Sequence, residues 1–475
     1  MFARYLTKER SLIMTRCLLI DFGSTFTKLT AVHLESATIL GSAKSKTTVE
    51  TNIIEGFNHA KDKLLSQLDS SNHTFDHNWA CSSAKGGFRM VAIGLSKTLT
   101  AEAAKRVALG AGTRILKVYS YGLKDEDIEE INQLQPDIIL VSGGTNGGNT
   151  VGIINDANKL TQLNSSIPIV VAGNEEAYSS ISHIFDKHSM SYYLTENVMP
   201  QVNVLNPDPT RQILRRIFME QIVEAKGMEV IEEQLGTSLI PTPSAVLQAA
   251  ELLSKGTTAT SGLGDLLIVD IGGATTDLHS VGDGKPIDPT IRMEGLQEPF
   301  EKRTVEGDLG MRYSALSLLE STTYQAFAHY LPNLSEDTIY QECYKRAHHP
   351  EMVATTEEEH LFDEAMGKIA IETAFNRHAG TYRREPTPTR VLLYQSGKDL
   401  KTFHTIIGTG GILVNSQHSK SMMEASLRKE NDTYLKPVDS SLYLDASYML
   451  SAMGTLAEHY PEEALAIMKK YLTKL

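Results

Sequence analysis

Cysteine, tryptophan and positive charge are scarce in this 475-residue chain. It has three cysteines and one tryptophan, and its 45 Lys and Arg are outnumbered by 58 Asp and Glu, which gives a net charge of −13. Cys17, Cys81 and Cys343 lie too far apart for a local metal motif, and an odd number without a disulfide framework favours a reducing cytoplasm. The acidic balance argues against nucleic acid as a partner, because binding a phosphate backbone requires a basic surface.

Long apolar runs and two common nucleotide-binding signatures are missing as well. No segment approaches the ~20 apolar residues of a membrane span, so no membrane partner is expected. Residues 1–14 are basic with only short apolar runs, and we expect a disordered leader there rather than a signal peptide. The chain has no GxxxxGK[ST] motif, and no GxGxxG follows a strand in a dinucleotide-binding context. These absences exclude P-loop and NAD- or FAD-binding proteins.

Two short apolar runs each lead directly into an Asp-x-Gly turn that is rich in hydroxyl residues. Residues 17–20 precede Asp21, and residues 266–269 precede Asp270. Each pattern predicts a buried strand, a tight turn and a second strand. The two turns lie 249 residues apart (270 − 21), which is about half of the chain.

Each half also contains a later strand that ends in a glycine cluster. Residues 137–141 lead into Gly143–Gly148, and residues 405–407 lead into Gly408–Gly411. Two elements that recur in the same order predict an internal duplication, with Gly143–Gly148 as the counterpart of Gly408–Gly411. Buried strands alternating with helices predict an α/β protein.

The pattern of elements predicts four parts of the chain. Apolar residues at three- and four-residue steps predict a helix over 241–253 between the halves, and two further helices over 443–453 and 462–472. We therefore expect the leader at 1–14, a first lobe at 15–245, a second lobe at 246–440, and C-terminal helices at 441–475 that pack back on the first lobe.

The two Asp-x-Gly turns predict a nucleotide site. Glycine lets backbone N–H groups approach phosphate oxygens, and Asp21 and Asp270 at the strand ends could hold Mg²⁺, mostly through water. The Gly408–Gly411 cluster would then lie near the adenosine. The residues predicted to bind ATP are Gly23, Ser24, Thr25, Thr27, Lys28, Gly272, Gly273, Thr275, Thr276, Gly408, Thr409, Gly410 and Gly411.

Four acidic residues are predicted to take part in the chemistry. Asp21 and Asp270 lie at the turns, and Glu306 and Asp308 flank a glycine 38 residues after Asp270 (308 − 270). Glu306 and Asp308 could orient an attacking water or reach Mg²⁺ through water. A solvated loop explains these two residues equally well.

The two turns, the helix between the halves and the second glycine cluster resemble motifs of a known superfamily. Residues 21–25 and 270–275 are similar to the two phosphate motifs of the actin, heat-shock-70 and sugar-kinase superfamily. Residues 241–253 resemble its interdomain helix, and residues 406–411 its adenosine motif. The resemblance implies two ribonuclease-H-like lobes around Mg-ATP.

A closer resemblance runs from about Cys17 to Leu472. The chain is similar to the glutamate mutase (methylaspartate mutase) accessory proteins of the GlmL/MutL family, which share only a short name with the mismatch-repair protein. Members are regarded as ATP-dependent reactivating or chaperone-like factors that release damaged corrinoid from adenosylcobalamin-dependent mutases or aminomutases. Phe88 stands where the family more often has Leu. The segments that carry this resemblance are 81–91, 137–148, 197–200, 205–206, 302–310 and 395–400.

Three other functions are compatible with the superfamily motifs. An activator of 2-hydroxyacyl-CoA dehydratases would need an iron–sulfur cluster, for which Cys81 and Cys343 would have to serve. A small-molecule kinase would need a hydroxyl-bearing substrate, and an actin-type scaffold would form filaments. The family resemblance favours an ATPase that acts on a partner protein over all three.

Overall fold

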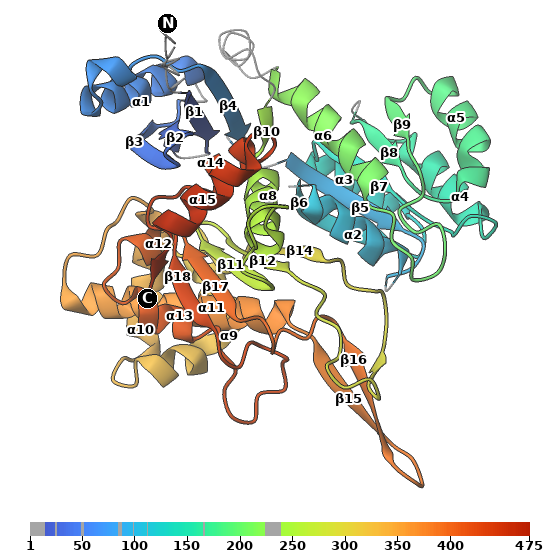
Figure 1. Ribbon diagram of the computed structural model, residues 1–475. Helices are drawn as coiled ribbons and strands as arrows, with labels where there is room; N and C mark the ends of the chain where they lie inside the picture. The colour runs from blue at the N-terminus through green and yellow to red at the C-terminus, as the bar shows by residue number, and fades with distance from the viewer. Residues whose placement is uncertain are drawn as a thin grey trace, which may run out of the picture.

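The computed structural model describes residues 15–23, 26–48, 52–83, 88–97, 99–111, 113–164, 167–223 and 239–475 (Figure 1). Within these ranges the chain is an α/β protein with four β-sheets, as the sequence predicts. The expected leader at 1–14 and the predicted phosphate-site residues Ser24 and Thr25 lie outside the described residues. None of the helices in the described ranges combines the length and apolar character needed to cross a bilayer.

The first sheet has five strands, in the order β10 (Leu239–Pro241), β4 (His77–Ser82), β1 (Arg16–Phe22), β2 (Phe26–His33) and β3 (Thr38–Lys46). Alternate side chains of β1 enter two different cores. Leu18 and Ile20 pack towards α1 (Ile53–Gln67), whereas Cys17 and Leu19 enter a core on the opposite face. All four are buried, as expected for a central strand that is covered on both faces.

The second sheet has six strands, in the order β14 (Glu301–Glu306), β12 (Thr276–Val281), β11 (Leu266–Ile271), β17 (Thr405–Thr409), β18 (Ser441–Leu444) and β19 (Thr473–Lys474). Its central strand β11 alternates in the same way as β1. Leu267 and Val269 face an outer layer of helices, and Leu266 and Ile268 face the opposite side. The outer layer consists of α9 (Ala315–Tyr330), α10 (Glu336–His348), α11 (Glu357–His378) and α13 (Ser419–Glu424).

Three helices lie between the two sheets and share one core with both: α8 (Thr242–Lys255), α14 (Leu450–Ala457) and α15 (Pro461–Tyr471) (Figure 1). The tryptophan of the chain, Trp79 in β4, stacks against this layer. Its ring lies 5.2 Å from that of His77 and 4.5 Å from that of His459, which follows α14. The last two helices thereby contact the first sheet.

The two central hairpins have the same strand register. Asp21 pairs with Lys28 between β1 and β2, and Asp270 pairs with Asp277 between β11 and β12. A shift of 249 residues places one register on the other. In addition, β10 leads into α8, and β18 leads through a short loop into α14. The predicted internal duplication is therefore confirmed by the register of the strands.

The predicted counterpart of Gly408–Gly411 is wrong. Thr409 of β17 lies beside Asp270, and the residue in the matching place beside Asp21 is Cys81 of β4. Gly143–Gly148 instead follows β7 (Ile138–Val141), which belongs to a third sheet. Similar spacing along the chain misled the prediction, because an inserted α/β unit separates β4 from β10.

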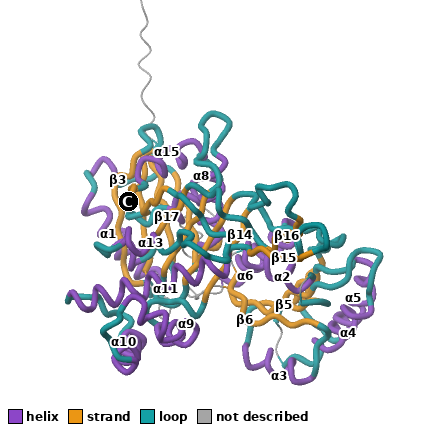
Figure 2. The backbone as a smooth tube through the Cα atoms, turned by 90° about the horizontal axis from the view of Figure 1, so that it is seen from below, coloured by secondary structure: helices purple, strands orange, loops and turns teal. Residues whose placement is uncertain are grey.

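This inserted unit is a doubly wound parallel sheet (Figures 1 and 2). Its strand order is 2-1-3-4-5: β6 (Thr113–Ser120), β5 (Phe88–Gly94), β7, β8 (Ile169–Val171) and β9 (Tyr192–Leu194). The loop after β7 is fixed by two buried amides, since Asn174 donates to the Gly148 carbonyl at 3.1 Å and Asn197 to the Gly144 carbonyl at 3.0 Å. Its helices are α2 (Thr100–Gly110), α3 (Asp125–Leu134), α4 (Val151–Leu160), α5 (Tyr178–Lys187) and α6 (Asp208–Val223).

The predicted helix over 443–453 is also wrong in its first half. Tyr443 and Leu444 pair with β17 as part of β18, and helix α14 begins only at Leu450. The apolar residues in this segment are compatible with both the helical and the strand period. The segment forms a strand because it pairs with the edge of β17.

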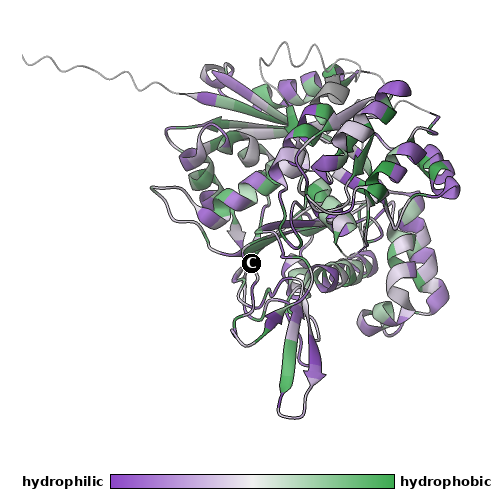
Figure 3. Cartoon of the chain, turned by 90° about the vertical axis from the view of Figure 1, so that its right-hand side faces the viewer, coloured by the Kyte–Doolittle hydropathy of each residue, from purple (hydrophilic) through white to green (hydrophobic). Residues whose placement is uncertain are grey.

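A small sheet projects from the second lobe (Figures 1 and 3). It contains β13 (Arg292–Met293), β16 (Val391–Ser396) and β15 (Thr381–Pro386), in that order. The remaining short helix, α12 (Gly411–Val414), directly follows the glycine cluster at the end of β17.

Candidate functional site

Asp21 lies near the end of β1 and is held by three side chains from distant parts of the chain. Its Oδ1 accepts hydrogen bonds from Thr242 Oγ1 at 2.8 Å and from Cys81 Sγ at 3.5 Å, and its Oδ2 accepts one from Ser451 Oγ at 3.0 Å. Lys28 Nζ lies 4.0 Å from Oδ2. The buried carboxylate of Asp21 is therefore well supplied with donors.

Asp270 occupies the equivalent place on β11 and has a different environment. No described residue donates a hydrogen bond to its carboxylate. Asp270 is half-buried, and part of its surface stays accessible to solvent. Desolvation, together with repulsion from Asp277, Asp445 and Asp21, raises the pKa of Asp270 to about 6, and the positive charge of Lys28 opposes this shift.

Two further carboxylates complete what we call the aspartate cluster: Asp21, Asp270, Asp277, Asp445 and Lys28. Asp277 Oδ2 accepts a hydrogen bond from Arg303 at 2.7 Å, and its Oδ1 has no partner among the described residues. Burial raises the pKa of Asp445, which accepts hydrogen bonds from the backbone N–H groups at the start of α14. Four carboxylates against Lys28 and Arg303 still leave an excess of negative charge, which a cation would relieve.

The residues present fit Mg²⁺ bound mostly through water. Asp270 has no hydrogen-bond donor among the described residues, so a cation would stabilise its ionised form. Within the described ranges, no three Asp, Glu, His or Cys side chains are arranged to hold a metal ion directly. An ion between Asp21 and Asp270 would therefore keep several water ligands, as Mg²⁺ prefers.

The two glycine turns have the same hydrogen bond. Gly23 N donates to Phe26 O at 3.1 Å, and Gly272 N donates to Thr275 O at 2.8 Å. In the second turn, the N–H groups of Gly273, Ala274 and Thr275 donate to no backbone acceptor among the described residues. Consecutive free N–H groups in a turn form a binding place for an anion such as a phosphate.

Two of the predicted hydroxyl ligands face the protein interior instead. Thr27 is fully buried and its Oγ1 lies 3.1 Å from Thr47 Oγ1, which in turn donates to the Gly23 carbonyl. Thr276 is also fully buried and donates to the Leu309 carbonyl at 2.7 Å. These threonines therefore hold the two turns through contacts on the side that faces the protein interior.

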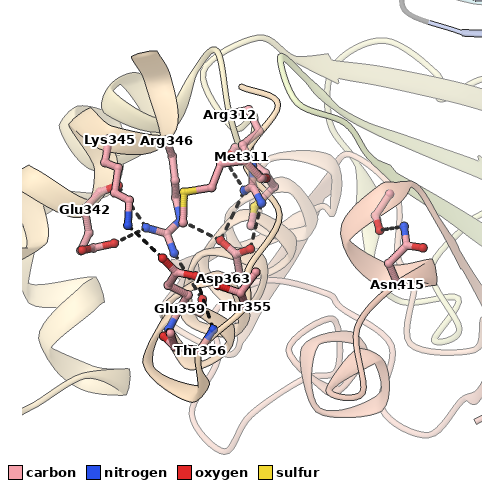
Figure 4. Close-up of polar contacts among 12 residues, drawn as sticks. Met311, Arg312, Glu342, Lys345, Arg346, Thr355, Thr356, Glu359, Asp363 and Asn415 are labelled. Atoms are coloured by element: carbon pink, nitrogen blue, oxygen red, sulfur yellow. Dashed lines mark hydrogen bonds and ion pairs between the residues drawn. The ribbon is translucent and has the colours of Figure 1, made fainter. Parts of the chain in front are cut away.

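The second turn is fixed from its other side by a buried charge cluster (Figure 4). Arg312 N donates to the Gly273 carbonyl at 2.8 Å, and the Arg312 guanidinium pairs with Asp363 at 2.9 Å. Arg346, which is fully buried, pairs with the other oxygen of Asp363 at 2.7 Å. A rigid carbonyl at Gly273 keeps the neighbouring N–H groups in place.

The Gly408–Gly411 segment reaches Asp270 through β17. Gly410 has φ +100°, and a Cβ there would lie 2.3 Å from the Ile271 carbonyl and 2.8 Å from Asp270 Oδ1. A side chain is thus excluded on both steric and conformational grounds. Gly408 and Thr409 are buried in β17, whereas a Cβ at Gly411 would meet open space.

Glu306 and Asp308 are already paired with an arginine. Arg377, at the end of α11, contacts Glu306 Oε2 and Asp308 Oδ1 at 2.7 Å and Asp308 Oδ2 at 2.8 Å. The Arg377 hydrogen bonds lower the pKa of Asp308. An ion-paired carboxylate is a weak base, so this arrangement favours fixing the 306–310 segment over accepting a proton.

The sequence did not point to Thr242, Ser451, Asp277, Asp445 or Tyr448. Tyr448 lies between the lobes, with its ring 4.7 Å from Lys28 Nζ and its hydroxyl 3.5 Å from the Asn415 amide. Asp277 could have been found by adding 249 to Lys28. The other four carry no local signal, because only the fold brings them to the cluster.

The two cysteines needed by an iron–sulfur activator are unsuited to that role. Cys81 and Cys343 are free and fully buried in different lobes. Burial raises the pKa of Cys343 to about 12, and it also raises the pKa of Cys81, next to Asp21. Thiols of this kind are poor metal ligands, since the thiolate is the ligating form.

The description "MutL protein" belongs to a family model that matches residues 17–472. The chain belongs to the MutL protein family. A MutL protein of Clostridium tetanomorphum is 51% identical over 463 residues, which cover 97% of this chain and 100% of that protein. The family relationship therefore includes both hairpins, the inserted unit and the projecting sheet.

Two solved structures are similar over most of their length. A nucleotide-free diol dehydratase-reactivating factor matches with a TM-score of 0.35 and 10% identity, over 94% of this chain and 100% of that one. A ligand-bound xylulose kinase from Lactobacillus acidophilus matches with a TM-score of 0.37 and 10% identity, over 97% and 93%. The lobe architecture of this MutL-family chain rests on the strand order and register described above.

Proposed function

We propose that this MutL-family protein binds and hydrolyses Mg-ATP at the aspartate cluster and uses it to act on a partner enzyme. The supporting observation is the pair of equivalent hairpins, which bring Asp21 and Asp270 from opposite lobes into one electrostatically coupled cluster. A site built from both lobes gives a bound nucleotide a means of changing how the lobes are arranged.

The roles of the individual groups follow from their surroundings. The free N–H groups at Gly273–Thr275 bind phosphate oxygens, and Lys28 adds a positive charge beside them. Mg²⁺, when bound, neutralises phosphate charge near Asp21 and Asp270. The open backbone at Gly411 gives room for the adenosine side of the nucleotide.

The hydrogen bonds around the cluster supply a path from nucleotide to partner. Thr242 at the start of α8 and Ser451 in α14 both donate to Asp21, so the helices between the sheets contact the site directly. On the other side, Arg303 joins Asp277 to the Leu109 carbonyl near the end of α2, in the inserted unit. A change in charge at the cluster therefore reaches three structural units.

We further propose that the partner is an adenosylcobalamin-dependent mutase, glutamate mutase or a related aminomutase, in the cytoplasm. The GlmL/MutL resemblance supports this choice. In this role the ATP-dependent change in lobe arrangement loosens the mutase and releases a damaged corrinoid, after which intact cofactor can bind.

The test is corrinoid release. Glutamate mutase is loaded with cyanocobalamin, this protein is added with Mg-ATP, and free corrinoid is followed by filtration and absorbance. We expect release with the wild type and none with Asp270→Asn or without ATP. Absence of release by a wild type that binds ATP would contradict glutamate mutase as the partner, and the same assay with an aminomutase decides whether the mutase role itself fails.

A further inference from the structure

The projecting sheet carries apolar side chains that belong to no core. We call β15, β16 and the turn between them the arm. Its strand β16 begins Val391-Leu392-Leu393-Tyr394, and none of these residues belongs to a hydrophobic core among the described residues. Val391 is 58% exposed, and Met293 on the neighbouring β13 is 42% exposed. A run of four exposed or half-exposed apolar residues outside these cores is typical of a binding surface.

The two faces of the arm differ in charge. Arg383 shares one face with Tyr394, and its charge is balanced by Glu294 and Glu385, each at 3.1 Å. Arg384 lies on the opposite face with Leu393. Arg384 has no ion-pair partner within the described ranges. That face thus combines apolar side chains with an uncompensated positive charge.

The tip and the side of the arm add two more unpaired guanidinium groups. Arg390 lies in the turn, which is closed by hydrogen bonds between Thr387 and Arg390. Arg292 lies on β13 and is exposed. Neither forms an ion pair with a described residue. A basic, apolar surface stands out on a protein whose net charge is −13.

The base of the arm is rigid and joined to the nucleotide site. Gln395 is fully buried and donates to the carbonyls of Gly284 and Gly397, both at 2.8 Å. The arm begins three residues after His378, the end of α11, whose neighbour Arg377 holds Glu306 and Asp308. A movement of the 306–310 segment, to which Arg377 is bonded, would therefore be passed on to the arm.

We propose that the arm is the surface by which this protein binds its partner enzyme, and that the partner offers an apolar groove bordered by carboxylates. This inference deepens the proposed function and rests on it. The apolar face with Val391 and Leu393 enters the groove, and Arg384 and Arg390 pair with the bordering carboxylates.

Two other occupants fit less well. Pairing of two copies through their β15 edges in the register that sets Arg383 against Arg384 would bring arginines together, which is repulsive. Nucleic acid would meet an overall charge of −13, and the apolar strip would gain nothing from a phosphate backbone.

The first experiment measures binding to glutamate mutase loaded with cyanocobalamin. The variants are Arg384→Glu with Arg390→Glu, and separately Val391→Ser with Leu393→Ser. Matched controls are Arg114→Glu with Lys187→Glu on the inserted unit, and Val438→Ser, since Val438 is 56% exposed. We expect each arm variant to weaken binding by about tenfold or more, while the controls bind within about twofold and all variants keep wild-type ATP hydrolysis and melting temperature.

Unchanged binding by both arm variants would overturn the inference and leave the proposed function standing. If the wild type itself does not bind glutamate mutase, that choice of partner fails, and a second experiment decides on the arm. A photo-crosslinking phenylalanine analogue replaces Val391, or Val438 as control, in the full chain in cells that produce it. Support first requires a crosslinked protein with the analogue at position 391 and none with it at position 438. The captured protein is then purified, and the Arg384→Glu, Arg390→Glu variant must bind it about tenfold more weakly than the wild type does. Adducts with this chain alone, with nucleic acid, or at both positions equally would overturn the inference.

Discussion

The two hairpins at the aspartate cluster have the same strand register, but their aspartates have different surroundings. Asp21 accepts three side-chain hydrogen bonds and faces Lys28 across its strand pair, whereas Asp270 accepts none from described residues and faces Asp277. Desolvation and the neighbouring charge of Asp277 raise the pKa of Asp270 to about 6. The two aspartates occupy equivalent positions in the duplicated hairpins. Asp21 joins α8 and α14 through its hydrogen bonds, whereas the surroundings of Asp270 favour a cation.

The largest expected effect is on catalysis, in Asp270→Asn. Removing the negative charge removes the group that would favour Mg²⁺ beside the phosphates, so ATP hydrolysis should fall on the order of 10²-fold or more. Because the charge was costly, stability should stay equal or increase. Steady-state phosphate release and thermal unfolding measure both. Wild-type turnover by a folded Asp270→Asn variant would show that the assignment is wrong.

The opposite outcome is expected at the first hairpin, where the main effect is on stability. Asp21→Ala leaves Thr242 and Ser451 without their acceptor, and the free energy of unfolding should fall by about 1–3 kcal/mol. Ser451→Ala, which removes a single donor, should cost about 1 kcal/mol or less. Urea denaturation tests both. An Asp270→Ala variant that loses as much stability as Asp21→Ala would remove the contrast between the hairpins.

The pH dependence of nucleotide binding gives an intermediate effect. The pKa of Asp270 is 3.8 in the unfolded chain and about 6 in the folded protein, so the folded state binds more protons between these two pH values. The contribution of Asp270 to the free energy of unfolding therefore falls as the pH rises from 3.8 to about 6, and it is constant at higher pH. Below pH 6 the protonated form can no longer attract Mg²⁺, and Mg-ATP affinity should decrease.

Calorimetry from pH 5 to 8 measures this effect, with Asp270→Asn as the control because ATP itself titrates in the same range. Lys28→Met should move the midpoint to higher pH, since the Lys28 charge holds the pKa of Asp270 down. A midpoint that is identical in wild type and Asp270→Asn would assign the titration to ATP alone.

The smallest effect is expected in the inserted unit. A Cβ at Gly147 would meet only Glu176, at 4.0 Å, so Gly147→Ala costs about 1 kcal/mol for its positive φ and leaves ATP affinity unchanged. Gly410→Ala, with its clash at 2.3 Å, should instead weaken ATP binding. Equal losses of ATP affinity in the two variants would instead assign Gly143–Gly148 to the nucleotide site, in which the sequence did not place it.

The two hairpins themselves were predictable from the sequence. A buried strand followed by Asp-x-Gly specifies a hairpin by itself, so both hairpins, their 249-residue offset and helix α8 follow from residues close together in the chain. The positions of Asp21 and Asp270 in those hairpins needed no further information.

The environment of each aspartate was not predictable, because it comes from tertiary contacts. Thr242 and Ser451 reach Asp21 from 221 and 430 residues away. For the same reason the orientation of Thr27 and Thr276 was missed: alternation along a strand gives two faces but does not say which one holds the ligand. The pairing of Glu306 and Asp308 with Arg377 likewise depends on how α11 crosses the sheet.

The hydrogen bond between Ser451 and Asp21 also has a consequence for biosynthesis. Chains are made from the N-terminus at ~5–20 residues per second, so roughly 20–90 s separate the synthesis of these two residues. During that time a nascent chain can form the first sheet, in which Asp21 has Cys81 and Thr242 as donors but still lacks Ser451. If nucleotide binds at the aspartate cluster as proposed, we expect the complete site to form only after α14 has been synthesised, near the end of translation.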